Sequence, residues 1–309
     1  FGEGLLRAGE IDEKVVALCA DLTKSTQMHL FKDKYPKRFF EMGVAEQNMA
    51  SVASGMAAMG KIPFISSYAV FSPGRNWEQI RTTIAYNNQP VKIAGNHVGV
   101  SVGPDGGSHQ ALEDIAMMRV LPNMIVMSPC DAIEARKATI EAAKINTPVY
   151  IRLSRDKTPV ITTENTSFEI GKAQVFWEPL HNEKAQVGII ATGTLVYKAL
   201  LAAKLLEQQK ISVKVLNLAT IKPLDTSAIL SLAKETKALV TVEEHQVAGG
   251  MGSAVAEFLS EHYPTPISFV GVHDKFGQSG TTEELLEHYG MGVSHIVGAV
   301  LSILKLKKH

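Results

Sequence analysis

Short apolar runs alternate with helical runs along the first half of the chain. The apolar runs, each of which predicts a strand, are 15–20, 63–67, 91–94, 125–127 and 149–152. The intervening runs, which predict helices, are 45–59, 74–87, 110–120 and 131–145. Strands that are apolar along their whole length and separated by helices are typical of a parallel sheet with both faces covered.

The same alternation returns after residue 184. The predicted strands are 187–191, 213–218 and 238–242, and the predicted helices are 194–208, 225–236, 252–262 and 293–305. Between 156 and 184 the periodicity fades, which favours a linker. We therefore predict an α/β fold of two domains, each a mostly parallel sheet flanked by helices: residues 1–155, a linker at 156–184, and residues 185–309.

Composition argues against two classes of binding partner. The 309 residues include 31 Lys and Arg against 31 Asp and Glu, so the formal net charge is zero. A protein whose main partner is nucleic acid or an anionic membrane usually carries a basic excess. No apolar run approaches the ~20 residues of a membrane span. We expect neither nucleic acid nor a membrane as a partner.

The two cysteines, Cys19 and Cys130, lie in or beside predicted strands, far apart in the sequence. Neither belongs to a cluster with metal-ligand spacing, so we expect no metal site in this chain. Two buried thiols in a reducing, cytoplasmic environment are the simplest interpretation. The sequence opens at Phe1 rather than at a methionine, so we expect further sequence upstream.

The helix predicted at 45–59 is unusual in composition. After Asn48 nearly every residue is small or apolar, which predicts a helix buried on all faces. Glu46 falls in its first turn. A carboxylate that enters a buried helix needs a partner, and such a group is suited to hold or share a proton with whatever lies against it. The alternative is that Glu46 only complements the positive end of the helix dipole.

Residues suited to chemistry follow the ends of four predicted strands. In open α/β sheets, ligands bind outside the carboxyl ends of the strands. The first of these loops, 20–25, contains Asp21 and Ser25. The second contains Tyr68 and Phe71, which could present two aromatic faces to a flat ring.

The other two loops add proton-transfer and anion-binding groups. His97 precedes a glycine-rich segment in which Asp105 and His109 offer an acceptor and a proton-transfer group. Arg155 follows the strand at 149–152 and could clamp an anion through two hydrogen bonds. Each residue alone also fits a structural role in a turn, a core or a surface ion pair. All of them fall at the same edge of one predicted sheet, which favours a site.

The order of these motifs resembles the transketolase family. In the first half the matching motifs are Ala20-Asp21-Leu22, Gly43-Val44-Ala45-Glu46-Gln47, Asp105-Gly106-Gly107-Ser108-His109-Gln110 and Leu153-Ser154-Arg155. In the second half they are Thr220-Ile221-Lys222-Pro223-Leu224-Asp225, Glu243-Glu244-His245 and Phe276-Gly277-Gln278-Ser279-Gly280. The resemblance covers essentially the whole chain, although the Gly-Asp-Gly metal–diphosphate motif of a full-length member is missing. The chain is thus similar to the pyrimidine-binding and C-terminal domains alone, either as the second subunit of a split transketolase or as a fragment of a longer enzyme.

The resemblance implies a cofactor site. Glu46 would hydrogen-bond the aminopyrimidine ring of thiamine diphosphate and act as a catalytic residue by directing the proton transfer that activates the cofactor. Tyr68 and Phe71 would pack against that ring, with Phe64 as a third aromatic residue. Asp21 would lie beside the cofactor.

The resemblance also implies a substrate site beside the cofactor. Asp105 and His109 would contact the first carbons of the substrate, and His109 would act as a catalytic residue. Ser25, His97 and Arg155 would reach the phosphate end of the sugar.

The implied activity is transfer of a two-carbon ketol unit from a ketose phosphate to an aldose phosphate, as in the pentose phosphate pathway. The implied partner is a separate N-terminal transketolase subunit, which would hold the diphosphate through Mg²⁺ or another divalent cation in a heterotetramer of two heterodimers. The alternatives are a 1-deoxyxylulose-5-phosphate synthase-like enzyme, a 2-oxo acid dehydrogenase beta subunit and a non-catalytic paralogue. His97 favours transketolase over the synthase, and Arg155 suits a phosphorylated sugar better than a free oxo acid.

Overall fold

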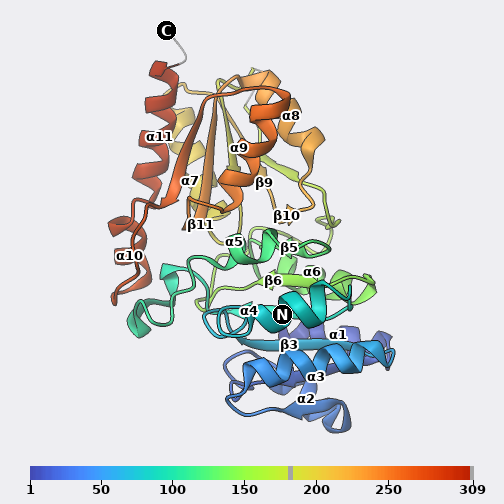
Figure 1. The fold of residues 1–309 in the computed structure, drawn as a ribbon. Helices are drawn as coiled ribbons and strands as arrows, with labels where there is room; N and C mark the ends of the chain where they lie inside the picture. Colours follow the sequence, from blue (N-terminus) through green and yellow to red (C-terminus); the bar gives the residue numbers. More distant parts are fainter. Residues whose placement is uncertain (180–183, 307–309) are drawn as a thin grey trace.

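The computed structural model describes residues 1–179 and 184–306, and they form two α/β domains (Figure 1). The first domain is built on a seven-stranded sheet. Its strands, in spatial order, are β10 (Thr220–Lys222), β5 (Ile125–Met127), β6 (Val149–Arg152), β4 (Lys92–Asn96), β3 (Ile62–Tyr68), β1 (Val15–Cys19) and β2 (Phe39–Glu41). β10 is antiparallel to β5, while the other neighbouring pairs are parallel, which confirms the predicted sheet type.

Successive residues of each buried strand point to opposite faces of the sheet. Since these residues are apolar, both faces need cover, and helices lie on both. Val15, Ala17 and Cys19 of β1 pack in a cluster with α1 and α2, whereas Val16 and Leu18 pack in a cluster with α3. The helices of this domain are α1 (Gly2–Ile11), α2 (His29–Lys34), η1 (Pro36–Arg38), α3 (Glu46–Ala58), α4 (Trp77–Gln79), η2 (Ile80–Ala85), η3 (Val100–Asp105), α5 (Asp114–Arg119) and α6 (Ala132–Lys144).

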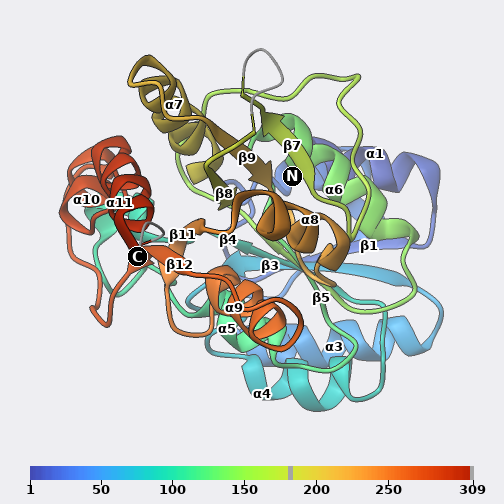
Figure 2. The ribbon, with the colours of Figure 1, turned by 90° about the horizontal axis from the view of Figure 1, so that it is seen from above.

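The second domain is built on a five-stranded sheet. Its strands, in spatial order, are β12 (Ile267–Val272), β11 (Leu239–Gln246), β8 (Val187–Ala191), β9 (Val213–Asn217) and β7 (Gln174–Trp177). Its helices are α7 (Leu195–Gln208), α8 (Thr226–Thr236), α9 (Met251–His262), α10 (Thr282–His288) and α11 (Val293–Leu306). α7 and α11 share one core cluster and α8 and α9 share another, so both faces of this sheet are covered too (Figure 2).

Two strands cross the domain boundaries that the sequence predicts. β7 lies inside the predicted linker 156–184, yet it pairs antiparallel with β9 at the edge of the second sheet. β10 comes from the predicted second domain, yet it pairs with β5 of the first sheet. Lys222 of β10 donates from Nζ to the carbonyl oxygens of Arg119 and Leu121 at 2.9 and 2.5 Å, which fastens this strand to the first domain. Four residues of the predicted linker, 180–183, lie outside the described residues.

α3 differs from its prediction because one of its faces is open. Met49, Ala50 and Ala53 are buried, but an opposite face is exposed to solvent. The exposed residues of α3 are Gln47, Asn48, Ser51, Gly55 and Ala58. The small and apolar composition of α3 therefore exceeds what this chain alone requires, and Val44 and Met59 beside it are 70% and 84% exposed.

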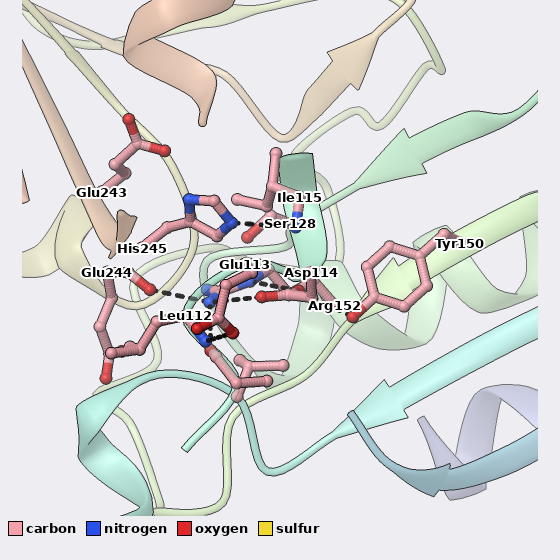
Figure 3. Close-up of polar contacts among 12 residues, drawn as sticks. Leu112, Glu113, Asp114, Ile115, Ser128, Tyr150, Arg152, Glu243, Glu244 and His245 are labelled. Carbon is pink, nitrogen blue, oxygen red and sulfur yellow. Dashed lines mark hydrogen bonds and ion pairs between the residues drawn. The ribbon is translucent and has the colours of Figure 1, made fainter. Parts of the chain in front are cut away.

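A buried ion pair of the first domain lies at the junction of the two domains (Figure 3). Arg152, at the end of β6, donates from Nε to Oδ2 of Asp114 at 2.8 Å and from Nη2 to Oδ1 at 3.2 Å. The hydroxyl of Tyr150 also donates to Asp114, at 2.7 Å. Arg152 uses Nη2 a further time, to donate to the carbonyl oxygen of Glu244 in β11 at 2.8 Å. The end of one sheet is thereby held against the end of the other.

His245 completes this junction from the second domain. Its Nδ1 lies 2.7 Å from the carbonyl oxygen of Gln246, and its Nε2 accepts from the backbone N–H of Ile115 at 3.1 Å. Complete burial lowers the pKa of His245 to about 4. The ring is therefore neutral at pH 7, which allows Nε2 to accept at the start of α5.

One stretch of the described residues, Thr282–Leu306, is long and apolar enough to span a membrane, and 33% of its most apolar window is buried. It consists of two helices, α10 and α11, with Gly290 at φ +75° between them. Ile296, Val300 and Ile303 of α11 belong to the core of the second domain. The apolar face of α11 thus covers a sheet.

Candidate functional site

The four loops with candidate residues meet at one edge of the first sheet, as predicted. β1, β3, β4 and β6 are neighbours in the sheet and run parallel. Their carboxyl ends therefore lie side by side, and the segments that follow them bring the candidate residues together.

An aromatic cluster forms at the ends of β3 and β4. The rings of Tyr68 and Phe71 are stacked, with centroids 6.3 Å apart and an interplanar angle of 18°. His97 stacks on Tyr68 with centroids 3.9 Å apart. The ring of His109 meets Tyr68 and Phe71 edge-on at 6.3 and 5.7 Å. Residues from two loops thus present two aromatic faces and a proton-transfer group at one place.

Glu46 lies beside this cluster at the start of α3. It is only 2% exposed, and its Oε2 forms an ion pair with Nη1 of Arg75 at 2.8 Å. The hydroxyl of Ser67, next to Tyr68 in β3, donates to Oε1 of Glu46 at 3.4 Å. Asn76 donates from Nδ2 to the backbone carbonyl of Glu46 at 3.0 Å, which holds the first turn of the helix in place. The carboxylate is therefore buried and paired, as its position in the sequence requires.

Arg75 is a site residue that the sequence analysis missed. Its guanidinium carbon lies 4.8 Å from the centroid of the Phe71 ring, so it joins the aromatic cluster to the Glu46 carboxylate. Its side chain is 45% exposed. Arg75 and Glu46 are 29 residues apart in the sequence, so no local sequence pattern predicts their contact.

These residues fit the pyrimidine end of thiamine diphosphate. A carboxylate and a hydroxyl suit hydrogen bonds to ring nitrogens, and Tyr68 and Phe71 supply faces for a flat ring. Asn76 adds a buried Oδ1 without a hydrogen-bond partner among the described residues. Glu46 would hold the ring, with Tyr68 and Phe71 against its face.

Phe64 does not belong to this site, contrary to the sequence-based expectation. Its side chain is fully buried in the core cluster under α1, with Leu5 and Phe31. The reason is its place in β3, four residues before Tyr68 and therefore about 13 Å away along the strand.

A cleft of about 440 Å³ opens beside the aromatic cluster. Ser25, His97 and Arg155 line it together. Nη1 of Arg155 donates to the carbonyl oxygen of Val102 at 2.8 Å, which leaves the remaining donors of the guanidinium for a ligand. Asp105 is exposed on the neighbouring loop.

The loop that carries Asp21 is organised by Glu41, a second residue that the sequence analysis missed. Oε1 of Glu41 accepts from the backbone N–H of Asp21 at 2.7 Å, and Oε2 accepts from the hydroxyl of Thr23 at 2.7 Å. The backbone of Asp21 is in the left-handed region, with φ 59°. The Asp21 side chain is exposed at the sheet edge rather than packed in a turn.

The surroundings of His97 in this site change its pKa. Burial, and then the positive charge of Arg155, lower the pKa of His97 to about 4. Its backbone is left-handed, with φ 56°, and its buried Nδ1 has no hydrogen-bond partner among the described residues. At pH 7 the neutral ring can therefore accept or donate one hydrogen bond.

Among residues 1–179 and 184–306 there is no group of three or more His, Cys, Asp or Glu side chains that could hold a metal ion.

Family models match nearly the whole chain. The transketolase pyrimidine-binding domain matches residues 1–160, and the transketolase C-terminal domain matches residues 178–296. The chain belongs to the transketolase family. Members of this family depend on thiamine diphosphate, which agrees with the fit of Glu46 and the aromatic pair.

Two similar relatives have almost the length of this chain. One, named a putative transketolase C-terminal section, from Methanocaldococcus jannaschii, is 41% identical over 308 residues, which cover 99% of this chain and 95% of the relative. The other, named a 6-deoxy-6-sulfo-D-fructose transketolase subunit, from a Clostridium species, is 41% identical over 303 residues, covering 98% and 92%. Human transketolase is 37% identical over 306 residues, but the chain spans only 48% of it.

A solved structure described as a split gene transketolase, inactive beta4 tetramer, has 47% sequence identity and a TM-score of 0.91. The match covers 99% of this chain and 97% of that chain. The transketolase of Leishmania mexicana, at 25% identity and a TM-score of 0.82, matches with 45% of its length. The chain is therefore similar over nearly its whole length to short members of the family as well as to parts of long ones.

The neutral state of His97 can be tested by NMR. With its pKa lowered to about 4, the ring nitrogens should show the neutral pattern from about pH 5.5 to 8. Arg155→Met should raise the pKa, because it removes a positive charge that opposes protonation. The His97→Gln variant assigns the signal, and a midpoint near the ordinary value in the unsubstituted protein would contradict this description.

Proposed function

We propose that this chain is the C-terminal subunit of a transketolase that transfers a two-carbon ketol unit from a ketose phosphate to an aldose phosphate. The observation that carries the proposal is the buried Glu46 carboxylate beside the stacked rings of Tyr68 and Phe71, next to a cleft that Arg155 lines. The names of the short relatives support it.

The first task of the chain is to hold and activate thiamine diphosphate. When bound, this cofactor supplies the nucleophilic carbon that accepts the two-carbon unit. Glu46 would hydrogen-bond the pyrimidine ring and hold or release a proton there. Ser67 keeps the carboxylate oriented, while Tyr68 and Phe71 exclude water from the ring face.

The second task is to bind the sugar. His109 would exchange a proton with the substrate oxygens at the first carbons, and Asp105 would accept hydrogen bonds from substrate hydroxyls. Ser25 and the neutral His97 would hydrogen-bond the anionic end, and Arg155 would neutralise its charge.

A partner chain is part of this proposal. The diphosphate end would be held by an N-terminal subunit through Mg²⁺ or another divalent cation. The exposed face of α3 and the exposed Val44 and Met59 lie close to Glu46 in the chain, and they suit contact with such a subunit. We further propose a dimer of heterodimers in the cytoplasm.

Two identities for the anionic group of the sugar are consistent with the proposal: a phosphate and a sulfonate. One relative is named for a sulfonated sugar, 6-deoxy-6-sulfo-D-fructose. A guanidinium can form paired hydrogen bonds with a phosphate or a sulfonate. Arg155 would therefore serve either substrate.

Glu46→Ala should abolish turnover by the assembled enzyme while leaving the circular dichroism spectrum unchanged. Loss of a positioned proton-transfer group typically costs on the order of 10²–10⁴-fold in rate. Glu46→Gln should be similarly impaired because it cannot exchange the proton. Glu78→Ala, an exposed glutamate of α4, is the matched control. Turnover of Glu46→Ala within a few-fold of the unsubstituted enzyme would refute the role of this carboxylate.

Arg155→Ala should weaken anionic donors far more than a short uncharged donor. Loss of a charge-assisted contact of about 1.5–3 kcal/mol lowers kcat/KM by roughly 10- to 100-fold. The assay compares a phosphorylated, a sulfonated and an uncharged ketose, with the exposed Arg81→Ala as control. Equal losses for all three donors would mean that Arg155 acts through its bond to Val102 instead.

A further inference from the structure

The segment 98–110, here called the substrate loop, carries Asp105 and His109 and is held largely by the second domain. Figures 1 and 2 show it extending from the first domain to lie beside α10. The backbone N–H of Ser101 donates to Oε1 of Glu244 at 2.6 Å. The hydroxyl of Thr282 lies 3.1 Å from the carbonyl oxygen of Ser101 and also contacts Oδ2 of Asp156. Both backbone polar groups of Ser101 thus meet side chains of the second domain.

The far end of the substrate loop is fastened in the same way. Gln110 is buried, and its Nε2 donates to the carbonyl oxygen of Gln278 in the second domain at 2.9 Å. The same nitrogen donates to the carbonyl oxygen of Val100 at 3.1 Å, which closes the loop on itself.

The glycines of the loop show how closely the second domain approaches. A Cβ added to Gly99 would lie 2.2 Å from Oε1 of Glu244, and one added to Gly106 would lie 2.6 Å from Oγ of Ser279. Both glycines are left-handed, with φ +77°. The loop is therefore shaped to receive the Glu244 carboxylate and the segment 276–280.

Glu244 is itself held rigidly. It is 3% exposed, its Oε2 accepts from the hydroxyl of Thr194 at 3.3 Å, and its carbonyl oxygen accepts from Arg152. Burial raises its pKa, while the charge of Arg152 opposes that rise. No other part of the site described above needs this carboxylate.

We propose that Glu244 is a positioning residue for sugar binding: through it the second domain holds the substrate loop, and with it Asp105 and His109, in the geometry that the sugar requires. This inference rests on the proposed function for the role of the loop. It gives the second domain a part in the reaction through the loop that it holds.

The test uses three variants. Glu244→Ala removes the acceptor for Ser101, whereas Glu244→Gln keeps an oxygen in the same place. Glu243→Ala is the matched control, because Glu243 is an equally buried neighbour whose carboxylate accepts from the backbone N–H groups of Met251 and Gly252 at 2.6 and 2.8 Å instead.

The first measurement is amide hydrogen exchange in the isolated chain, which requires no activity. Glu244→Ala should speed exchange in the peptides covering 98–110 by about tenfold or more, because the Ser101 amide loses its acceptor. Glu244→Gln should remain close to the unsubstituted chain, and Glu243→Ala should speed exchange at the start of α9 but not in the loop. Unchanged loop exchange in Glu244→Ala overturns the proposal.

The second measurement uses the chain with its partner subunit. Glu244→Ala should lower kcat/KM for the ketose donor by about 10- to 100-fold. Exchange of the thiazolium C2 proton, which depends on Glu46 and precedes sugar binding, should stay within about twofold. Equal loss in both assays, or an unchanged kcat/KM, overturns the positioning role. An unsubstituted pair without transfer activity contradicts the proposed function, and amide exchange then decides whether Glu244 holds the loop.

If Glu244→Ala does not fold, Thr282→Val replaces it. This variant removes a half-buried hydroxyl that contacts both the Ser101 carbonyl and Asp156. It should speed loop exchange and lower donor kcat/KM by about threefold, again without changing C2 exchange. An unchanged loop in this variant overturns the proposal equally.

Discussion

The buried ion pair between Arg152 and Asp114 is the contact on which the arrangement of the molecule depends. Both side chains are almost completely buried, at 4% and 0% exposed, so each is very costly to leave without the other. Removing one partner of such a pair costs about 3–5 kcal/mol. Because Arg152 also donates to the carbonyl oxygen of Glu244, the two sheets are fixed relative to each other at the same point. The substrate loop lies in the angle between them, and its geometry follows from this junction.

The site at the sheet edge also contains an ion pair of a buried carboxylate, and an exposed helix face lies beside it. Glu46 is buried and paired with Arg75, and the aromatic cluster shields it from one side. The other side of α3 consists of polar and small residues that are exposed in this chain. Under the proposed function, the chain would supply the groups for the pyrimidine end of the cofactor and for the sugar. A surface beside Glu46 remains for the subunit that would hold the diphosphate.

Local pattern was enough to predict the central strands and the start of α3. It was also enough to place Tyr68, Phe71, His97 and Arg155 at one edge, because parallel strands share that edge. Local pattern did not predict features that depend on contacts between residues far apart in the sequence. β7 and β10 are short strands defined by distant partners, and the contact of Glu244 with Ser101 spans 143 residues. The expectation that Phe64 would join Tyr68 at the site was wrong, because Phe64 lies four positions earlier in β3 and is therefore far from the end of the strand.

The central claim is that this chain forms half of an active site. The most direct measurement is an assay of the purified chain with thiamine diphosphate, Mg²⁺, a ketose phosphate and an aldose phosphate, repeated with increasing amounts of the N-terminal subunit. The account predicts no transfer above background for the chain alone, and turnover that rises with added subunit and saturates at an equimolar ratio. Robust turnover by the chain alone would contradict it.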